Sequence, residues 1–294
     1  MAFRIQIVDV MRQIVQECEM TMDRLSSLLH HFNLHASTFH RGGFCGTSSH
    51  GEHEPHGYIH LLRAGRMRFR EGNGRELRLE EPSLMLVARP RLHEMTASEA
   101  DGAELVCATL VFDGGIDNPL SRSLPGAIVK PLRELPSLSG CLDWLFAEAA
   151  GEDCGRELVL NRLFELMVIQ LLRHLMNSRE LASGMMAGLA EPRLARALNQ
   201  LHEKPQHGWS VAELAALAGM SRASFAAHFH QVVGATPADY LVGWRVSLAQ
   251  KRLREGRPMA LIADEVGYES PSALARAFRR KVGASPSEWL KESG

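Results

Sequence analysis

Hydrophobic residues change their spacing along this chain of 294 residues. Between about residues 37 and 112 they alternate with polar residues or form short apolar runs, as in YIHLLRAGRMRFR, RELRLEEPSLMLVA and ELVCATLVF. This pattern is typical of β-strands, and Gly72-Asn73-Gly74 between two of the segments is a hairpin signal. Short strands separated by regular turns predict a β-sandwich or barrel.

A helical period precedes and follows this β-rich region. Upstream, Asp23 stands as a cap before the apolar positions that begin at Leu25. Downstream, apolar residues at helical spacing predict one helix over residues 138–149 and a longer one over residues 157–177. The longer helix packs within its own domain, against a second copy of the chain or against the C-terminal domain, and the sequence leaves these alternatives open.

The last hundred residues contain one pattern twice. Residues 210–241 and 258–290 align at an offset of 48 before a turn and of 49 after it, so the second turn has one extra residue. In each copy a short helix with a small residue lets a second helix cross closely, and a glycine and a capping serine follow. These residues are Ala215, Gly219 and Ser221, then Ala263, Gly267 and Ser270. We therefore predict two helix-turn-helix motifs, joined by a helix over residues 237–254.

The second helix of each motif has an apolar face and a polar face. Phe225 and Phe229, like Leu274 and Phe278, recur at i and i+4 and are expected to face inward. The outward positions carry cations and hydroxyls, which position phosphates and bond to base edges. Any one of them alone is an ordinary solvated residue, but two copies at nearly fixed offset favour function. The predicted DNA-binding residues are Ser221, Arg222, Ser224, His228, Ser270, Ser272, Arg276, Arg279, Arg280 and Lys281.

The net charge of −1 conceals a difference between the two ends of the chain. Residues 191–294 carry 14 Lys and Arg against 10 Asp and Glu, a net of +4, and the remainder carries 19 against 24, a net of −5. A basic end on an acidic body is typical of a protein with one part on nucleic acid. Because +4 is modest, we expect affinity to depend on dimerisation or on a neighbouring site.

Residues 191–294 resemble the C-terminal DNA-binding domain of the AraC/XylS family of bacterial transcription regulators. The resemblance rests on GYESPSALARAFRRKVGASPSEWL and on ATPADYLVGWRVSLAQKRL, which contains Trp244, Arg245 and Ala249. It implies a double-stranded DNA partner and two reading helices on one polypeptide. Ala227 departs from the family, which often has a basic residue there.

Residues 22–175 are similar, more weakly, to the cupin-type sensor domain of one AraC subgroup. IHLLRAG (59–65) matches a strand that contains His and ends in a glycine turn, and LVARPRLH (86–93) matches a later segment that runs through Pro to His. The subgroup's Gly-Asp before the second strand is replaced by Glu81-Pro82-Ser83. The fold class implied is α+β, with an N-terminal cupin-like β-barrel and flanking helices before an all-α domain of two helix-turn-helix motifs.

Five histidines gather near the expected mouth of the barrel, with Glu52 and Glu54 among them: His50, His53, His56, His60 and His93. Imidazole and carboxylate groups suit zinc or iron, and the ligands of such an ion would come from His53, His56, His60 and His93. Catalytic cupins use H-x-H followed by a glutamate, whereas His53 and His56 are spaced H-x-x-H. We therefore expect no required cofactor. Without a metal, His56, His60 and His93 line a sensor cavity.

Five cysteines, at positions 18, 45, 107, 141 and 154, form no C-x-x-C pair, and their odd number indicates free thiols in a reducing compartment. Cys45, in a turn-like segment near histidines, is the stronger candidate for a reactive thiolate. Cys107 is the second redox candidate, although its strand position favours the core. An oxidant is therefore one possible signal beside a small molecule.

These signals divide the chain into an extension or mis-assigned start (1–21), a sensor and dimerisation domain (22–182), a linker (183–190) and an AraC-type DNA-binding domain (191–294). We expect a cytoplasmic, homodimeric transcription regulator, since no run of residues suits a membrane span and the start lacks the features of a secretory signal. As an activator it would also contact RNA polymerase, but the sign of regulation is open. The alternatives are a cupin metalloenzyme with an accessory helical domain and an interaction module that does not bind DNA.

Overall fold

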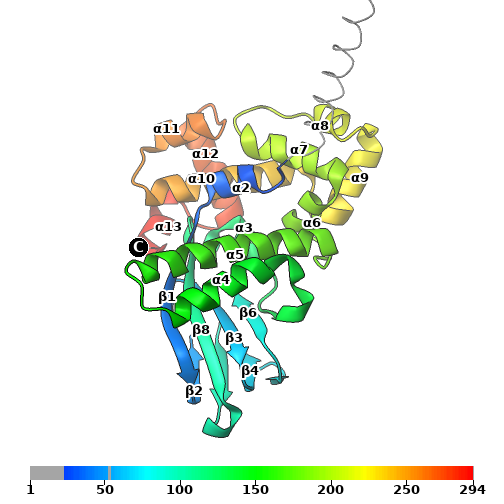
Figure 1. Cartoon of the computed structure of the whole chain (residues 1–294). Coiled ribbons are helices and arrows are strands. Elements are labelled where there is room, and N and C mark those ends of the chain that lie inside the picture. The colour runs from blue at the N-terminus through cyan, green and yellow to red at the C-terminus, as the bar shows by residue number, and fades with distance from the viewer. Residues whose placement is uncertain (1–22, 52–53, 294) are drawn as a thin grey trace, which may run out of the picture.

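The computed structural model describes residues 23–51 and 54–293, which form a β-rich N-terminal region beneath a helical C-terminal region (Figure 1). The expected extension at 1–21, with Cys18, and the metal candidate His53 lie outside the described residues. Among the helices of the described part, none is long and apolar enough to cross a membrane.

Two antiparallel sheets build the N-terminal region. The first has the order β1 (Leu34–Phe44), β8 (Ala103–Phe112), β3 (Gly57–Ala64), β6 (Ser83–Val87) and β9 (Ile128–Pro131). The second has the order β2 (Gly46–His50), β7 (His93–Ala97), β4 (Met67–Glu71) and β5 (Leu77–Leu79). The predicted hairpin turn at Gly72-Asn73-Gly74 joins β4 to β5.

An apolar cluster fills the space between the two sheets. Both sheets contribute to it, with Leu62 and Met85 from the first and Phe69 and Met95 from the second. In β7 every second residue is buried, as expected of a strand with one face toward a core. The two facing sheets around a shared core confirm the predicted fold class for this half.

Helices cover the outer face of the five-stranded sheet (Figure 1). These are α4 (Ser139–Ala150) and α5 (Arg156–Ser178), close to the predicted bounds. Leu163, Phe164, Met167 and Leu171 of α5 are buried, so this helix packs within the chain. The shorter elements are α2 (Ser26–His31), η1 (Glu99–Asp101), η2 (Gly115–Asp117), α3 (Pro119–Ser123), η3 (Leu132–Glu134) and η4 (Pro136–Leu138).

The C-terminal region contains both predicted helix-turn-helix motifs. Its helices are α6 (Met185–Ala190), α7 (Pro192–Glu203), α8 (Val211–Leu217), α9 (Arg222–Val233), α10 (Pro237–Arg254), α11 (Met259–Glu265), α12 (Pro271–Val282) and α13 (Pro286–Ser293). Helices α8 and α9 form the first motif and α11 and α12 the second, with α10 between them. Gly219 and Gly267 have φ of 62° and 81°, the left-handed conformation for which glycine was expected.

Residues 183–190, expected to be a linker, instead contain the packed helix α6. Met186 and Leu189 are completely buried. A Cβ on Gly188 would lie 2.7 Å from Leu198 and 2.9 Å from Val233, so the small residue allows α6 to approach α7 and α9. The uncharged, glycine-bearing composition therefore reflects close packing.

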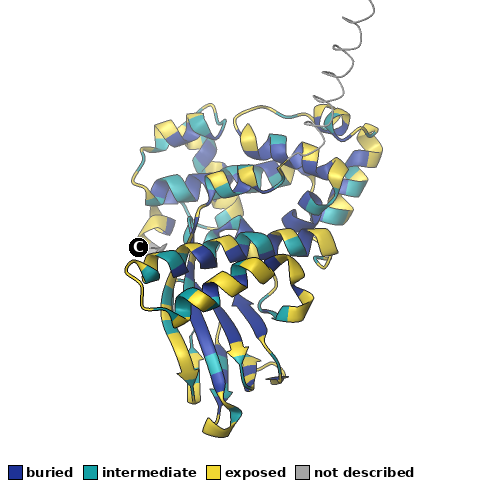
Figure 2. Ribbon diagram, in the orientation of Figure 1, coloured by how far each residue is buried: buried dark blue, intermediate teal, exposed yellow. Residues whose placement is uncertain are grey.

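Burial is continuous across the two regions. One hydrophobic cluster runs from the outer face of the five-stranded sheet through α5 and α6 into the C-terminal helices (Figure 2). The rings of Phe32, after α2, and Trp244 of α10 meet edge to face with centroids 5.3 Å apart. The two regions thus share a core. Because a close-packed core transmits strain, a displacement of side chains in one region also displaces those in the other.

Candidate functional site

The outward residues of α9 and α12 are accessible to a partner. Arg222 and Ser224 are exposed in the first turn of α9, and Ser272, Arg276 and Arg279 are exposed along α12, followed by Arg280 and Lys281. The opposite faces are fully buried through Phe225, Phe229, Leu274 and Phe278. Each helix therefore presents one polar face while its apolar face anchors it.

The two predicted serine caps hold the first turns of these helices. Ser221 Oγ accepts from the backbone N–H of Ser224 at 3.3 Å, and Ser270 Oγ accepts from that of Ala273 at 3.2 Å. Each hydroxyl keeps its own hydrogen, which remains free to bond to a phosphate oxygen.

Two of the predicted DNA-binding residues lie next to another part of the protein. His228 Nε2 lies 3.8 Å from the carboxylate of Glu191, the cap of α7. Lys281 lines a cavity of about 460 Å³ between the two regions, together with Asp117 and Arg122 from one side and Gln250 from α10. Both stay accessible in part, because the side chain of His228 is 34% exposed and Lys281 is exposed, so their contact with DNA stays a prediction.

Arg245 of α10 connects the two motifs, a role that the sequence did not indicate. Its guanidinium donates to the carbonyl oxygens of Pro205 (2.7 Å), His207 (3.0 Å) and Gly267 (3.1 Å). It also lies over the ring of Tyr268, 5.3 Å from the centroid. One side chain thereby holds the segment before α8 and the turn of the second motif against the same helix.

Helix α10 is also attached to the β-rich region. Lys251 Nζ donates to Asp113 Oδ2 at 2.9 Å and to the carbonyl oxygen of His31 at 2.6 Å. One turn further, Arg254 bonds to the carbonyl oxygen of Gly114 and to Asp117 Oδ2 at 3.2 Å. Asp113 directly follows β8, so a strand of the sheet ends on the helix that carries both motifs.

Three histidines meet between the two sheets. His60 and His93 are completely buried with their Nε2 atoms 3.0 Å apart. His50, directly opposite His93 in the β2–β7 pair, completes the group. Of the predicted metal ligands, His60 and His93 belong to this group and His56 does not. His50, which was outside the predicted set, is the third member. Strand register, which residue spacing does not reveal, makes this selection.

Burial keeps these imidazoles neutral. It lowers the pKa of His60 well below its usual value and lowers that of His93 to about 4, despite the opposing hydrogen bond with the carbonyl oxygen of Arg91. Burial also lowers the pKa of His50. Neutral imidazole is the form that can accept a hydrogen bond or ligate a metal.

His56 lies beside the group rather than in it. Its Nε2 is 2.9 Å from the hydroxyl of Tyr58, which donates to the carboxylate of Glu54. This hydrogen bond lowers the pKa of Glu54. A carboxylate therefore stands close to the histidines, in the position where the sequence had placed acidic residues.

The cysteines differ in access. Cys45 is exposed in the loop between β1 and β2, and Cys107 is buried in β8. Burial strongly raises the pKa of the Cys107 thiol. Cys107 lies opposite His40 in the pairing of β8 with β1, and His40 is five residues before Cys45. At about 3.3 Å per residue along a strand, Cys45 and Cys107 are more than ~10 Å apart, which is too far for a disulfide.

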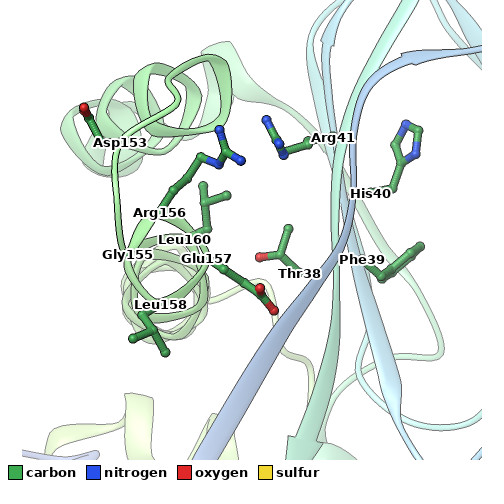
Figure 3. A pocket seen from close by; sticks show the side chains of 10 residues that line it. All are labelled: Thr38, Phe39, His40, Arg41, Asp153, Gly155, Arg156, Glu157, Leu158 and Leu160. Carbon is green, nitrogen blue, oxygen red and sulfur yellow. The ribbon is translucent and has the colours of Figure 1, made fainter.

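A groove of about 740 Å³ runs between β1 and the start of α5 (Figure 3). Two arginines line it, and both donate to nearby backbone carbonyl oxygens: Arg41 to Ala149 at 3.2 Å and Arg156 to Gly151. These bonds stabilise the loop between α4 and α5. The exposed side chain of Leu158 lies at the outer edge (Figure 3).

Two helix-turn-helix motifs on one helix, joined to a two-sheet domain with an enclosed core, define a class of regulators. Residues 23–177 match the family described as Cupin, and residues 214–292 match a family described as a helix-turn-helix domain. The chain belongs to the AraC family of transcription regulators, in the group with a cupin-type N-terminal domain. This confirms the family and fold class expected from the sequence.

Several known proteins are similar. A putative AraC-like transcription regulator of Streptomyces antibioticus is 47% identical over 199 residues, 66% of this chain and 66% of that protein, slightly less than two thirds of its length. The RCS-specific HTH-type transcriptional activator RclR of Escherichia coli (strain K12) is 28% identical over 235 residues, 78% of this chain and 82% of that protein. The solved DNA-binding domain of AdpA, in complex with a target DNA, is 33% identical to this chain. The match covers 35% of this chain and 92% of the solved AdpA chain, with a TM-score of 0.32. The Streptomyces antibioticus and Escherichia coli relatives are both described as transcription regulators, so the metalloenzyme alternative is not favoured.

Proposed function

We propose that this protein is a sequence-specific, double-stranded DNA-binding regulator whose cupin-like domain senses a small molecule or an oxidant and repositions the two helix-turn-helix motifs. The observation that carries the proposal is the pair of exposed, serine-capped helices α9 and α12 on one connecting helix. As a DNA-binding protein it works in the compartment that contains the DNA, the cytoplasm.

The connecting helix suits two neighbouring segments of the major groove. Helix α10 has 18 residues and is therefore about 27 Å long. Reading helices on one face of a duplex are about 34 Å apart, one helical turn. Helix α10 with the motifs at its two ends spans this order of distance, and Arg245 keeps the motifs in fixed register.

We assign different contacts to the two ends of the reading helices. The N-terminal part of a recognition helix contacts base edges, which favours Arg222 and Ser224 in α9 and Ser272 and Arg276 in α12. Arg279 and Arg280, further along α12, are proposed to contact phosphates, as are the two capping serines.

The signal is proposed to pass through β8. This strand lines the sheet core with Cys107, and Asp113, the residue after it, pairs with Lys251 of α10. A change in the spacing of the sheets would displace this contact and the helix that carries both motifs. His56, His60 and His93 remain the proposed sensor residues, and Cys45 remains the candidate thiol for an oxidant.

We also propose that the protein is a homodimer and an activator. Trp144, Leu158 and Leu166 are large exposed apolar side chains on α4 and α5, with Trp144 58% and Leu158 72% exposed. Dimerisation through these helices compensates for the modest basic charge. The name of the Escherichia coli relative describes an activator, which for this chain implies contact with RNA polymerase.

Duplex binding by single arginine variants tests the proposal. On the DNA upstream of its own gene, Arg276→Ala is expected to weaken binding roughly 5- to 150-fold, because a bidentate base contact is worth about 1–3 kcal/mol. Arg279→Ala is expected to reduce the slope of the logarithm of the binding constant against the logarithm of the salt concentration by about one. Arg78→Ala, an exposed arginine on β5, is the matched control. Equal binding by all three variants would contradict the assignment.

Footprinting with and without hydrogen peroxide tests the oxidant. An oxidant that acts through Cys45 changes the protected positions in the wild type and not in Cys45→Ser. Cys154→Ser, which removes another exposed thiol, is the control and should respond as the wild type does. The same footprint with and without oxidant would leave a small molecule as the signal.

A further inference from the structure

His50, His60 and His93 come together from both sheets of the cupin-like domain. His50 ends β2 and His93 begins β7, where the two are cross-strand partners. His60 lies within β3 of the facing sheet. One ring nitrogen of each lies within 4.8 Å of those of the other two.

We propose that these three histidines form a binding site for one divalent transition-metal ion, for which zinc is the test ion. Nitrogen ligands lie about 2.0–2.1 Å from zinc, so two of them in a tetrahedral site are about 3.3 Å apart. The Nε2 atoms of His60 and His93 are 3.0 Å apart, and the His50 ring stacks on His93 with centroids 5.0 Å apart. The first spacing fits two ligands of one ion, and the ring nitrogen of His50, within 4.8 Å of both, is close enough to become the third after a small side-chain movement.

The hydrogen bond of His93 to the backbone sets its orientation as a ligand. Nδ1 of His93 is 3.0 Å from the carbonyl oxygen of Arg91, an atom that only accepts, so Nδ1 carries the ring hydrogen. Nε2 of the neutral ring then presents its lone pair toward His60. Histidines that bind metals commonly donate their other N–H to a carbonyl in this way.

The surroundings restrict the rings and provide negative charge. Tyr58 lies parallel to His60, with an angle of 9° between the rings and centroids 5.7 Å apart. Phe69 lies 5.9 Å from His93. The hydroxyl of Tyr58 donates to the carboxylate of Glu54, which places an anionic group beside the histidines. Three protein ligands leave a fourth position for water or for a donor atom of an effector.

Without a metal, the contact between His60 and His93 is a hydrogen bond between two neutral rings. The two alternatives make different predictions for zinc binding, and neither depends on DNA. Failure of this proposal therefore leaves the proposed function untouched, and the reverse also holds.

Zinc binding by the full-length chain, with any affinity tag removed, is the test. We expect one zinc per chain by elemental analysis after dialysis, and a Kd of about 1 µM or tighter in competition with a chromophoric chelator. Zinc in excess is expected to raise the melting temperature by roughly 5 °C. His50→Gln and His60→Gln should each weaken binding at least ~100-fold, since each removes a ligand.

His230→Gln, at an exposed position of α9, is the matched control and should bind zinc as the wild type does. His60 is completely buried, so circular dichroism of each variant accompanies the titration. If His60→Gln does not fold, the half-buried His50 decides the result. A wild type that retains no zinc, or a folded His50→Gln that binds it unchanged, overturns the proposal.

Discussion

Lys251 of the connecting helix and Asp113 at the end of β8 form an ion pair of 2.9 Å across the boundary between the two regions. The lysine side chain is 14% exposed, so water screens the pair only in part. The same ammonium donates to the carbonyl oxygen of His31, which fixes its position. The pair joins the sheet to the helix that carries both DNA-binding motifs.

A double-mutant cycle on this pair is our first prediction. Lys251→Met and Asp113→Asn, alone and together, should give a coupling free energy of about 1–2 kcal/mol in chemical unfolding. The more exposed pair Arg63–Glu104, 3.3 Å apart between β3 and β8, is the control, for which about 0.2–1 kcal/mol is expected. Coupling no greater than in the control would show that the ion pair does not hold the two regions together.

The two turn glycines provide a second prediction. Both have positive φ, so Gly219→Ala should lower the free energy of unfolding by about 1–2 kcal/mol. In Gly267→Ala the new Cβ would also lie 2.5 Å from the Cα of Gln206, which adds about 1–3 kcal/mol of steric cost. Gly219 has open space around it and is the internal control. Equal losses in thermal or chemical unfolding would contradict the close approach of the 206 segment.

Stability should fall in mild acid because of His202. Burial lowers the pKa of this histidine to about 3, while its Nε2 contacts the hydroxyl of Tyr240 and its ring stacks on Trp244. The unfolded chain takes up a proton near pH 6.5 and the folded chain does not, so this contribution is complete above pH 6.5 and declines below it. Between pH 7.5 and pH 5 it amounts to about 2 kcal/mol.

Unfolding by urea at the two pH values measures the effect. His202→Asn, which does not titrate, should lose less stability on acidification than the wild type, whereas the exposed His230→Gln should lose as much. Identical pH dependence in His202→Asn and the wild type would contradict the role of His202.

Thiol reactivity should follow exposure. Cys45 and Cys154 are exposed, whereas Cys107 is buried and burial raises its pKa, so little thiolate forms there. Iodoacetamide should alkylate the first two within minutes and Cys107 at least ~100-fold more slowly. Mass spectrometry of peptides from native and urea-unfolded protein measures the rates. Fast alkylation of native Cys107 would indicate that β8 opens readily.

Local signals in the sequence were sufficient for the DNA-binding half. The glycine turns, the serine caps and the i, i+4 apolar pairs each act within a few residues, so Gly219, Ser221 and Phe225 could be interpreted without knowledge of the rest of the chain. The hairpin at Gly72-Asn73-Gly74 and the cap at Asp23 are local in the same way.

Relationships over long distances were not accessible in this way. His50 and His93 are 43 positions apart and meet because of strand register, and a shift by one residue would have placed the ring of His93 on the outer face. His228 lies on the outward side of its helix by spacing, yet it contacts Glu191 from another element. The small residues of 183–190 suggested a linker, but in the structure they pack against α7 and α9.

By itself, the sequence determined the two helix-turn-helix motifs, the β-rich first half and the family, because turns, caps and periodic apolar faces depend on neighbouring residues. The tertiary structure alone decided which histidines meet, how Arg245 holds the motifs in register and how Lys251 reaches Asp113. Those contacts depend on the packing of sheets and helices whose residues are far apart in the chain. Chain folding, and not local propensity, brings their side chains within hydrogen-bond distance.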